Sequence, residues 1–282
     1  MGKVYEALQR AEAERGRRGA GAVPGVTAPA AQPIARAPGG APAGRLARLR
    51  SWVVRQIRPV EVEDANAYNK RRISLLQPDS FVAEQFRTLR ARLDALASER
   101  PIRTIAVTSA MPNEGKTTAA LNLALVSSMS LGRRVLLVDC DLRRPKIQAA
   151  LGLRPECGLA EVLTDAGTLE RAVIKVEGTS LSVLPVRATP SNPSELLASD
   201  RMRSLVEELA RSYDQVIFDT PPTLALPDAK TMSELTDGLV FVVRANETPR
   251  DDVAAALDIL DRRRVLGVVL NGVEAEPERY GY

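Results

Sequence analysis

Hydrophobic residues follow two alternating patterns from about residue 80 onward. Continuous apolar runs typical of buried parallel strands occupy residues 104–107, 135–138, 215–219, 238–244 and 265–271. Segments with apolar residues at helical spacing lie before or between them, at 81–97, 117–125, 200–213 and 250–260. This alternation predicts an α/β fold with a doubly wound, mostly parallel sheet and helices on both faces.

Local signals set several of the expected boundaries. An Asp-Ser pair at 79–80 is expected to cap the helix of 81–97, and Gly132 to end the helix that begins after residue 116. Residues 152–197 are richer in loops, with short helices and a strand expected near 181–186. That segment is the natural place for a lid or an interface.

The first 60 residues differ in composition from the rest. Residues 1–18 place Val4, Leu8 and Ala11 on one helical face, which predicts a short amphipathic helix or else a solvated terminus. Residues 19–60 form an Ala/Pro/Gly-rich basic linker. Its end, 44–59, has a basic amphipathic pattern around Trp52 that suits an anionic membrane surface, a partner, or folding back on the domain. We expect one globular domain at 75–276 and a short tail at 277–282.

The amino-acid composition excludes several kinds of catalytic and metal site. The chain contains no histidine, which excludes Ser-His-Asp hydrolysis and His-based zinc sites, so that Asp, Glu, Lys and backbone groups must carry any reaction. Two cysteines without a CxxC spacing suggest a reducing, cytoplasmic setting. No apolar run approaches the roughly 18 residues that a membrane span needs. We therefore expect a cytoplasmic protein that is soluble or peripheral to a membrane.

The net charge of +4 is unevenly distributed. Residues 1–60 hold 11 Lys or Arg and 3 Asp or Glu, a net charge of +8, which leaves 28 and 32, a net charge of −4, for residues 61–282. The basic character of the chain therefore comes from residues 1–60, which we call the basic leader. Because the globular part is mildly acidic and poor in aromatic residues, no nucleic-acid partner is expected.

The chemistry-bearing motif follows the first apolar run. Residues 110–117 fit the phosphate-loop pattern G-x-x-x-x-G-K-[ST], with Ala110 in place of the first glycine. Gly115 would let backbone N–H groups face phosphate oxygens, and the following helix would point its positive end at the same anion. Lys116 would reach the β- and γ-phosphates, and the Thr117 hydroxyl would bind Mg²⁺. The alternative is an ordinary turn that contains Gly-Lys-Thr and binds no phosphate.

Acidic residues follow two further apolar runs. Asp139 and Asp141 come at the end of the run at 135–138, with Arg143 just beyond, and Asp219 ends the run at 215–219. Ligands of open α/β sheets gather at the carboxyl ends of the strands, so these carboxylates suggest Mg²⁺-nucleotide machinery. Taken singly, an aspartate after a strand is often only a helix cap, but three of them in one chain with a phosphate loop argue against that reading.

These three motifs, together with N-P-S-E-L-L at 192–197, make residues 75–282 similar to the bacterial tyrosine kinases. Members of that family are phosphate-loop NTPases with the sheet of MinD/ParA-like ATPases, and they regulate the chain length of capsules and exopolysaccharides. The opening M-G-K-V-Y-E-A-L-Q-R-A-E further resembles the stand-alone, exosortase-associated form, which is encoded apart from its membrane adaptor.

The resemblance implies an ATP-dependent protein-tyrosine autokinase with Mg²⁺ as cofactor. Thr117, Asp139 and Asp219 would organise the metal, and Asp141 would orient or deprotonate the attacking tyrosine hydroxyl. The catalytic set implied is Lys116, Asp139, Asp141 and Asp219. The nucleotide would be bound by Met111, Pro112, Asn113, Glu114, Gly115, Lys116, Thr117 and Thr118, with Asn271 at the adenine.

The resemblance also implies partners. The E-x-x-R-x-x-R spacing of Glu84, Arg87 and Arg90 is similar to the family's oligomerisation helix, by which copies form a ring and present their tails to neighbours. Tyr280 and Tyr282 would accept the phosphate. A membrane-bound polysaccharide copolymerase or chain-length adaptor would recruit the kinase to the inner face of the membrane, and a cognate phosphatase would reverse its action.

Two other functions remain compatible with the same motifs. A nucleotide-binding scaffold of the polysaccharide export complex would bind ATP without transferring phosphate, which the short two-tyrosine tail allows. A partitioning or division-site ATPase would share the sheet. Those ATPases carry an additional lysine five residues before the loop lysine, where this chain has Met111.

Overall fold

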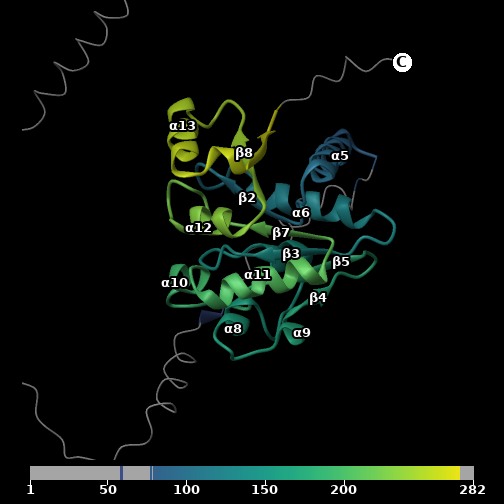
Figure 1. The fold of residues 1–282 in the computed structure, drawn as a ribbon, viewed down its shortest axis with the longest axis vertical. Coiled ribbons are helices and arrows are strands. Elements are labelled where there is room, and N and C mark those ends of the chain that lie inside the picture. Colours follow the sequence, from purple (N-terminus) through teal and green to yellow (C-terminus); the bar gives the residue numbers. More distant parts are fainter. Residues whose placement is uncertain (1–57, 60–76, 78, 274–282) are drawn as a thin grey trace, which may run out of the picture. The chain divides into compact units, whose positions relative to one another are not determined.

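The computed structural model describes residues 58–59, 77 and 79–273 (Figure 1). The helix predicted at 1–18, nearly all of the linker at 19–60 and the tail at 277–282 lie outside these residues. At the end of the linker, Arg58–Pro59 forms strand β1, which pairs antiparallel with β6, Ala188–Thr189. The helical pattern predicted up to residue 59 is therefore wrong at these two positions, because their backbone pairs with another strand.

The main sheet has seven strands in the order β4-β5-β3-β7-β2-β8-β9. Every neighbouring pair is parallel except β4 with β5. The predicted doubly wound, mostly parallel sheet is confirmed. The strands are β2 (Thr104–Ser109), β3 (Val135–Asp139), β4 (Ile174–Lys175), β5 (Leu181–Leu184), β7 (Gln215–Asp219), β8 (Gly238–Arg244) and β9 (Val265–Asn271).

Helices cover both faces of this sheet (Figure 1). Side chains alternate between the faces, as a strand requires: in β8, Val240 and Val242 pack in the same core cluster as α6, whereas Leu239 and Phe241 pack in the cluster that includes α13. The helices are α5 (Phe81–Glu99), α6 (Lys116–Ser128), α7 (Ile147–Leu151), α8 (Leu159–Leu163), α9 (Leu169–Ala172), α10 (Pro193–Leu197), α11 (Asp200–Ser212), α12 (Asp228–Leu235) and α13 (Arg250–Ile259), with a short 3-10 turn at Arg262–Arg264.

Side-chain hydrogen bonds help to set two helix boundaries, the start of α5 and the end of α6. Ser80 caps α5 by accepting a hydrogen bond from the Ala83 N–H at 3.2 Å, as predicted. Helix α6, however, ends at Ser128 and not at Gly132. The Arg90 guanidinium donates to the Val126 carbonyl at 2.9 Å and so satisfies one of the last carbonyls of the helix, while Gly132, with φ +74°, forms the turn that follows.

None of the helices in the described ranges is both long enough and apolar enough to span a bilayer.

Candidate functional site

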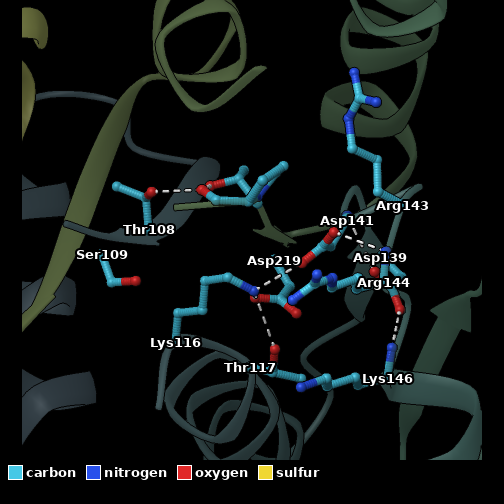
Figure 2. Close-up of polar contacts among 12 residues, drawn as sticks. Thr108, Ser109, Lys116, Thr117, Asp139, Asp141, Arg143, Arg144, Lys146 and Asp219 are labelled. Carbon is cyan, nitrogen blue, oxygen red and sulfur yellow. Dashed lines mark hydrogen bonds and ion pairs between the residues drawn. The ribbon is translucent and has the colours of Figure 1, made fainter. Parts of the chain in front are cut away.

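Three neighbouring strands bring the predicted acidic and loop residues to one edge of the sheet. Strands β3, β7 and β2 are adjacent, and Asp139 at the end of β3 lies directly opposite Asp219 at the end of β7. The phosphate loop continues from Ser109, the last residue of β2, into α6. Figure 2 shows Lys116, Thr117, Asp139, Asp141 and Asp219 gathered at this edge.

The phosphate loop depends on a glycine at position 115. Gly115 has φ +95°, a conformation that side-chain-bearing residues rarely adopt. A Cβ atom there would lie 2.0 Å from the side-chain nitrogen of Asn271. That nitrogen donates to the Glu114 carbonyl at 2.9 Å, so Asn271 packs directly on the loop. Asn113, with φ 68°, is a second residue in the left-handed region.

The Glu114 side chain ties the loop to a distant part of the chain. Its carboxylate accepts a hydrogen bond from the Met111 N–H at 2.8 Å and another from the Thr248 hydroxyl. Thr248 in turn accepts from the Arg244 N–H at 3.0 Å, at the end of β8. Sequence reasoning missed Thr248, because a lone threonine 134 positions away from its partner carries no pattern of its own.

Lys116 lies at the centre of the acidic cluster. Its ammonium nitrogen is 3.0 Å from Asp141 Oδ2, 3.8 Å from Asp219 Oδ1 and 3.4 Å from the Thr117 hydroxyl. Burial tends to lower the pKa of Lys116, but the charges of Asp219 and Asp141 outweigh it, so that the pKa is raised. The lysine therefore stays a cation and partly neutralises the carboxylates around it.

Asp139 is fully buried and held by backbone groups. One carboxylate oxygen accepts from the Asp141 N–H at 3.1 Å, and the other accepts from the N–H groups of Lys146 and Ile147, both at 3.1 Å. Burial, reinforced by the charges of Asp219 and Asp141, raises the pKa of Asp139 well above its usual range. In this arrangement Asp139 fixes the loop after β3 and the start of α7.

Asp219 is the carboxylate best suited to a metal ion. It is fully buried, yet neither of its oxygens has a hydrogen-bond partner. Burial raises its pKa, against the attraction of Lys116. Its nearest cation is Lys116, 3.8 Å away, and its free oxygens leave room for a second cation. Mg²⁺ takes one or two carboxylates together with phosphates and waters. Among residues 58–59, 77 and 79–273, no group of three or more Asp, Glu, His or Cys side chains is arranged so that it could hold a metal ion by itself.

A cleft of about 290 Å³ opens beside Lys116 and Asp141. Three basic residues from the loop after β3 line it, and three apolar residues from the segment after β7 line it as well. We call it the P-loop cleft. Its lining consists of Pro112, Asn113, Lys116, Asp141, Arg143, Arg144, Lys146, Pro222, Ala225 and Leu226.

Arg143 joins the second motif to the N-P-S-E-L-L motif. Its guanidinium donates to the Ser194 hydroxyl at 2.8 Å and lies 3.7 Å from the buried carboxylate of Asp228. The Ser194 hydroxyl also donates to Asp228 at 2.5 Å. This network connects Ser194, near the start of α10, to the loop after β3.

The residues of the predicted oligomerisation helix lie on α5, outside the lining of the P-loop cleft. Arg87 and Glu84 form an ion pair at 2.7 Å, and the Glu84 side chain is 62% exposed. Arg90 is directed inward, since it donates to the Val126 carbonyl and to the Ser130 hydroxyl, each at 2.9 Å. The two predicted phosphate acceptors, Tyr280 and Tyr282, lie outside the described residues.

Comparison with known sequences gives one group of relatives. The family described as an AAA domain matches residues 102–253. Tyrosine-protein kinase YwqD of Bacillus subtilis (strain 168) is 38% identical over 213 residues, which cover 74% of this chain and 90% of YwqD. Tyrosine-protein kinase ptk of Acinetobacter johnsonii is 30% identical over 228 residues, 79% of this chain but 31% of ptk. The chain thus spans most of the first relative and about a third of the second.

Solved structures agree with the sequence comparison. The chimerical protein CapA2B2 superposes with a TM-score of 0.69 at 30% identity, covering 81% of this chain and 99% of that one. The kinase domain of Escherichia coli tyrosine kinase ETK gives a TM-score of 0.69 at 32% identity, covering 74% and 84%. The Pyrococcus furiosus cell division ATPase MinD gives 0.51 at 25% identity over 60% and 71%, so the sheet is also MinD-like.

Proposed function

The chain belongs to the bacterial tyrosine-protein kinase family, and from that membership we propose that its P-loop cleft transfers the γ-phosphate of ATP to Tyr280 and Tyr282 of a neighbouring copy. It is an ATP-using tyrosine autokinase of capsule and exopolysaccharide biosynthesis. The stand-alone, exosortase-associated form is part of the proposal. The observation that carries it is the position of the Lys116 ammonium between Asp141 and Asp219 at the end of the phosphate loop.

Nucleotide binding would rest on the loop and on Lys116. Gly115 brings the backbone to the anion without a side chain in the way, and the start of α6 directs its unpaired N–H groups there. The nucleotide would be bound by Met111 to Thr118. Asn271, predicted at the adenine, packs on the Glu114 carbonyl, which supports a second role in fixing the loop.

Mg²⁺ would be held by Thr117 and Asp219, with Asp139 beside them. When bound, it supplies charge neutralisation for the phosphates. Asp219 fits this role because both of its oxygens are buried and lack hydrogen-bond partners. Asp139 already accepts three backbone hydrogen bonds, so its share in the metal site is more naturally through a bound water.

The transfer step places the acceptor hydroxyl at Asp141. Lys116 would exchange its contact with Asp141 for the phosphates, which leaves the carboxylate to accept the phenol proton. The bond between the γ-phosphorus and the tyrosine oxygen forms as the bond to the bridging oxygen of ADP breaks, and ADP leaves. Such transfer needs mainly positioning and neutralised charge, so no histidine is required.

The tail begins close to the site. Strand β9 ends at Asn271, whose side chain contacts the phosphate loop, and Tyr280 follows nine positions later. Nine residues span at most about 30 Å. A segment of that length is long enough for the tail tyrosines to approach this edge of the sheet on their own copy, and transfer to a neighbouring copy is part of the proposal.

The predicted partners belong to the same proposal. The matching chimera of a CapA and a CapB segment supports partnership with a membrane adaptor, which would recruit the kinase to the inner face of the membrane through the basic leader. Ring formation would use Glu84 and Arg87 of α5, with Arg90 bracing α5 on α6. A cognate phosphatase would reverse the modification.

The test is phosphotyrosine formation by the full chain, mixed with the cytoplasmic segment of the adaptor and Mg-ATP. We expect strong labelling of the wild type, loss of at least about a thousandfold in Lys116→Met because the phosphate charge is no longer neutralised, and loss in Tyr280→Phe/Tyr282→Phe. Arg211→Gln, in the last turn of α11 and outside the cleft lining, serves as the matched surface control. A wild type that never gains phosphotyrosine with its activator would show that the site does not catalyse the transfer.

A further inference from the structure

Three basic side chains line one side of the P-loop cleft without a part in the chemistry described above. Arg143, Arg144 and Lys146 follow β3 directly and line the cleft beside Lys116. Lys116 is paired with Asp141, so its charge is already balanced. We call the other three the basic wall. Figure 2 shows all three at the end of β3, with the Arg143 side chain extending away from the acidic cluster.

The backbone of the basic wall is fixed, and two of its cations have no acidic partner. The Arg144 N–H donates to Asp141 at 3.0 Å, and the Lys146 N–H donates to the buried Asp139 at 3.1 Å. Within residues 58–59, 77 and 79–273, neither side-chain cation forms an ion pair. Arg143 is held in place by Ser194 and Asp228, and its side chain is still 40% exposed. Arg144 and Lys146 thus stand on a fixed backbone, and although the charge of Lys146 also acts to lower the pKa of Asp219, neither cation is engaged in an ion pair. Such cations are suited to bind an anionic partner.

The rest of the lining has a different character. Pro222, Ala225 and Leu226, from the segment after β7, contribute apolar surface to the same cleft. A phenol ring can pack on such a surface while its hydroxyl lies at Asp141. A peptide bound with its tyrosine in the cleft would then have its flanking residues close to the basic wall.

The tail has the complementary pattern. Glu274, Glu276 and Glu278 occupy alternate positions ahead of Tyr280. In an extended peptide alternate side chains lie on one face, with about 3.3 Å of rise per residue, so the three carboxylates would form a single row of about 13 Å. This row has the opposite sign to the wall.

We propose that the basic wall binds the acidic residues that precede the acceptor tyrosine. The substrate class of this kinase is then a tyrosine preceded by carboxylates at every second position, in its own tail and in any external substrate. This inference rests on the proposed transfer to Tyr280 and Tyr282. Charge pairing at an exposed wall sets the choice of substrate and its rate of encounter more than the chemical step.

The experiment uses the full chain with Tyr280→Phe/Tyr282→Phe, activated by the adaptor segment, as the enzyme. Two peptides are supplied as acceptors: residues 274–282 as they stand, and the same peptide with Gln at 274, 276 and 278. Three exposed charge pairs at about 0.5 kcal/mol each, about 1.5 kcal/mol together, predict about a tenfold lower kcat/KM for the neutral peptide. The difference should shrink as salt is added, because exposed charges are screened.

Variants of the basic wall test whether its side chains cause the difference in kcat/KM between the two peptides. Arg144→Gln/Lys146→Gln removes two of the three pairs and should lower kcat/KM for the acidic peptide by about fivefold, while leaving the neutral peptide and the KM for ATP unchanged. Arg144→Glu/Lys146→Glu should instead favour a peptide with Lys at 274, 276 and 278. Arg211→Gln, at the far end of α11, should behave as the parent enzyme.

Each contrary outcome has its own meaning. Equal kcat/KM for the acidic and neutral peptides overturns the inference while leaving the transfer reaction intact. A rise in the KM for ATP, with no change for either peptide, assigns the wall to the nucleotide and also overturns it. Absence of phosphate on both peptides contradicts the proposed function itself.

Discussion

The P-loop cleft has a volume of about 290 Å³ and five of its ten lining residues are charged, whereas a groove of about 430 Å³ between α5 and the edge strand β9 has one charged residue, Arg92, in a mainly apolar lining. We call the latter the α5–β9 groove. In the cleft, Lys116 and Asp219 are almost completely buried. In the groove, Val268 and Leu270 are 57% and 58% exposed. Both regions reverse the usual preference of polar residues for the surface and apolar ones for the core.

The two regions differ in how clearly their side chains indicate a bound ligand. Buried charges are expensive unless something pairs with them, so the cleft shows its need for a ligand in the two oxygens of Asp219 that lack hydrogen-bond partners. Exposed apolar side chains cost little in the monomer and give no such signal of chemistry. Asn271 links the two regions, since it lines the groove and also holds the phosphate loop.

The largest expected effect comes from changing the loop of the cleft itself. Gly115→Ala adds a Cβ in a left-handed backbone and against Asn271, so we expect the free energy of unfolding to fall by about 2–4 kcal/mol and ATP binding to be lost. Chemical denaturation and calorimetry with Mg-ATP would measure both. The double variant Gly115→Ala/Asn271→Ala removes the clash but keeps the backbone strain, and should recover part of the stability. Unchanged ATP affinity in Gly115→Ala would mean that the loop does not approach the phosphates.

Removing a buried charge from the cleft should raise the free energy of unfolding, whereas the loop substitution lowers it. Asp219→Asn eliminates a carboxylate without hydrogen-bond partners, while Lys116 keeps its ion pair with Asp141 at 3.0 Å. We therefore expect the free energy of unfolding to rise by about 1 kcal/mol and phosphotyrosine formation to be lost. Scanning calorimetry without nucleotide, paired with the kinase assay, measures the two effects. A variant less stable than the wild type would mean that this carboxylate is already satisfied.

Asp219→Asn should also change how the free energy of unfolding depends on pH. The pKa of Asp219 is raised above its ordinary value of 3.8 in the folded protein, so the folded state binds more protons between the two values. The stability of the wild type should therefore fall as pH rises from about 4 towards the raised pKa. Asp219→Asn should show a weaker fall, with the buried Asp139 accounting for what remains.

The smallest expected effect lies in the α5–β9 groove. Val268→Thr/Leu270→Thr changes side chains that are more than half exposed, so we expect the free energy of unfolding to change by less than about 0.5 kcal/mol, with ATP affinity unchanged. As a matched core control, Leu137→Ala in β3, which is fully buried, should cost about 2–5 kcal/mol. A large loss from the groove variant would mean that these side chains are covered in solution.

Much of the fold was predictable because strands and helices alternate in a pattern set by burial. The carboxyl ends of adjacent parallel strands necessarily meet, so Asp139 and Asp219 were expected at one edge before any coordinates. Helix α12 was missed because it is only eight residues long and its buried face, Asp228, Ala229, Met232 and Ser233, holds only two apolar side chains. The edge position of β9 was not predictable either, since an edge strand and a central one can have the same apolar run.

The supporting contacts of the site were less accessible to sequence reasoning. Ser194 and Asp228 anchor Arg143 from 51 and 85 positions away, and Thr248 holds Glu114 across 134. Such partners are chosen by the folded geometry and leave no local spacing. For Asp139 the pattern predicted a metal site, whereas the structure gives it three backbone donors, because the loop after β3 turns back over its carboxylate.

The most direct test of transfer from the P-loop cleft of one copy to the tail of another is a mixing experiment. Lys116→Met, which keeps its tail, is combined with Tyr280→Phe/Tyr282→Phe, which keeps its cleft, in the presence of Mg-ATP and the adaptor segment, and phosphosites are mapped by mass spectrometry. We predict phosphate on Tyr280 and Tyr282 of the Lys116→Met chain. Absence of phosphate on those two tyrosines, while the wild type alone is labelled there, would contradict transfer between copies.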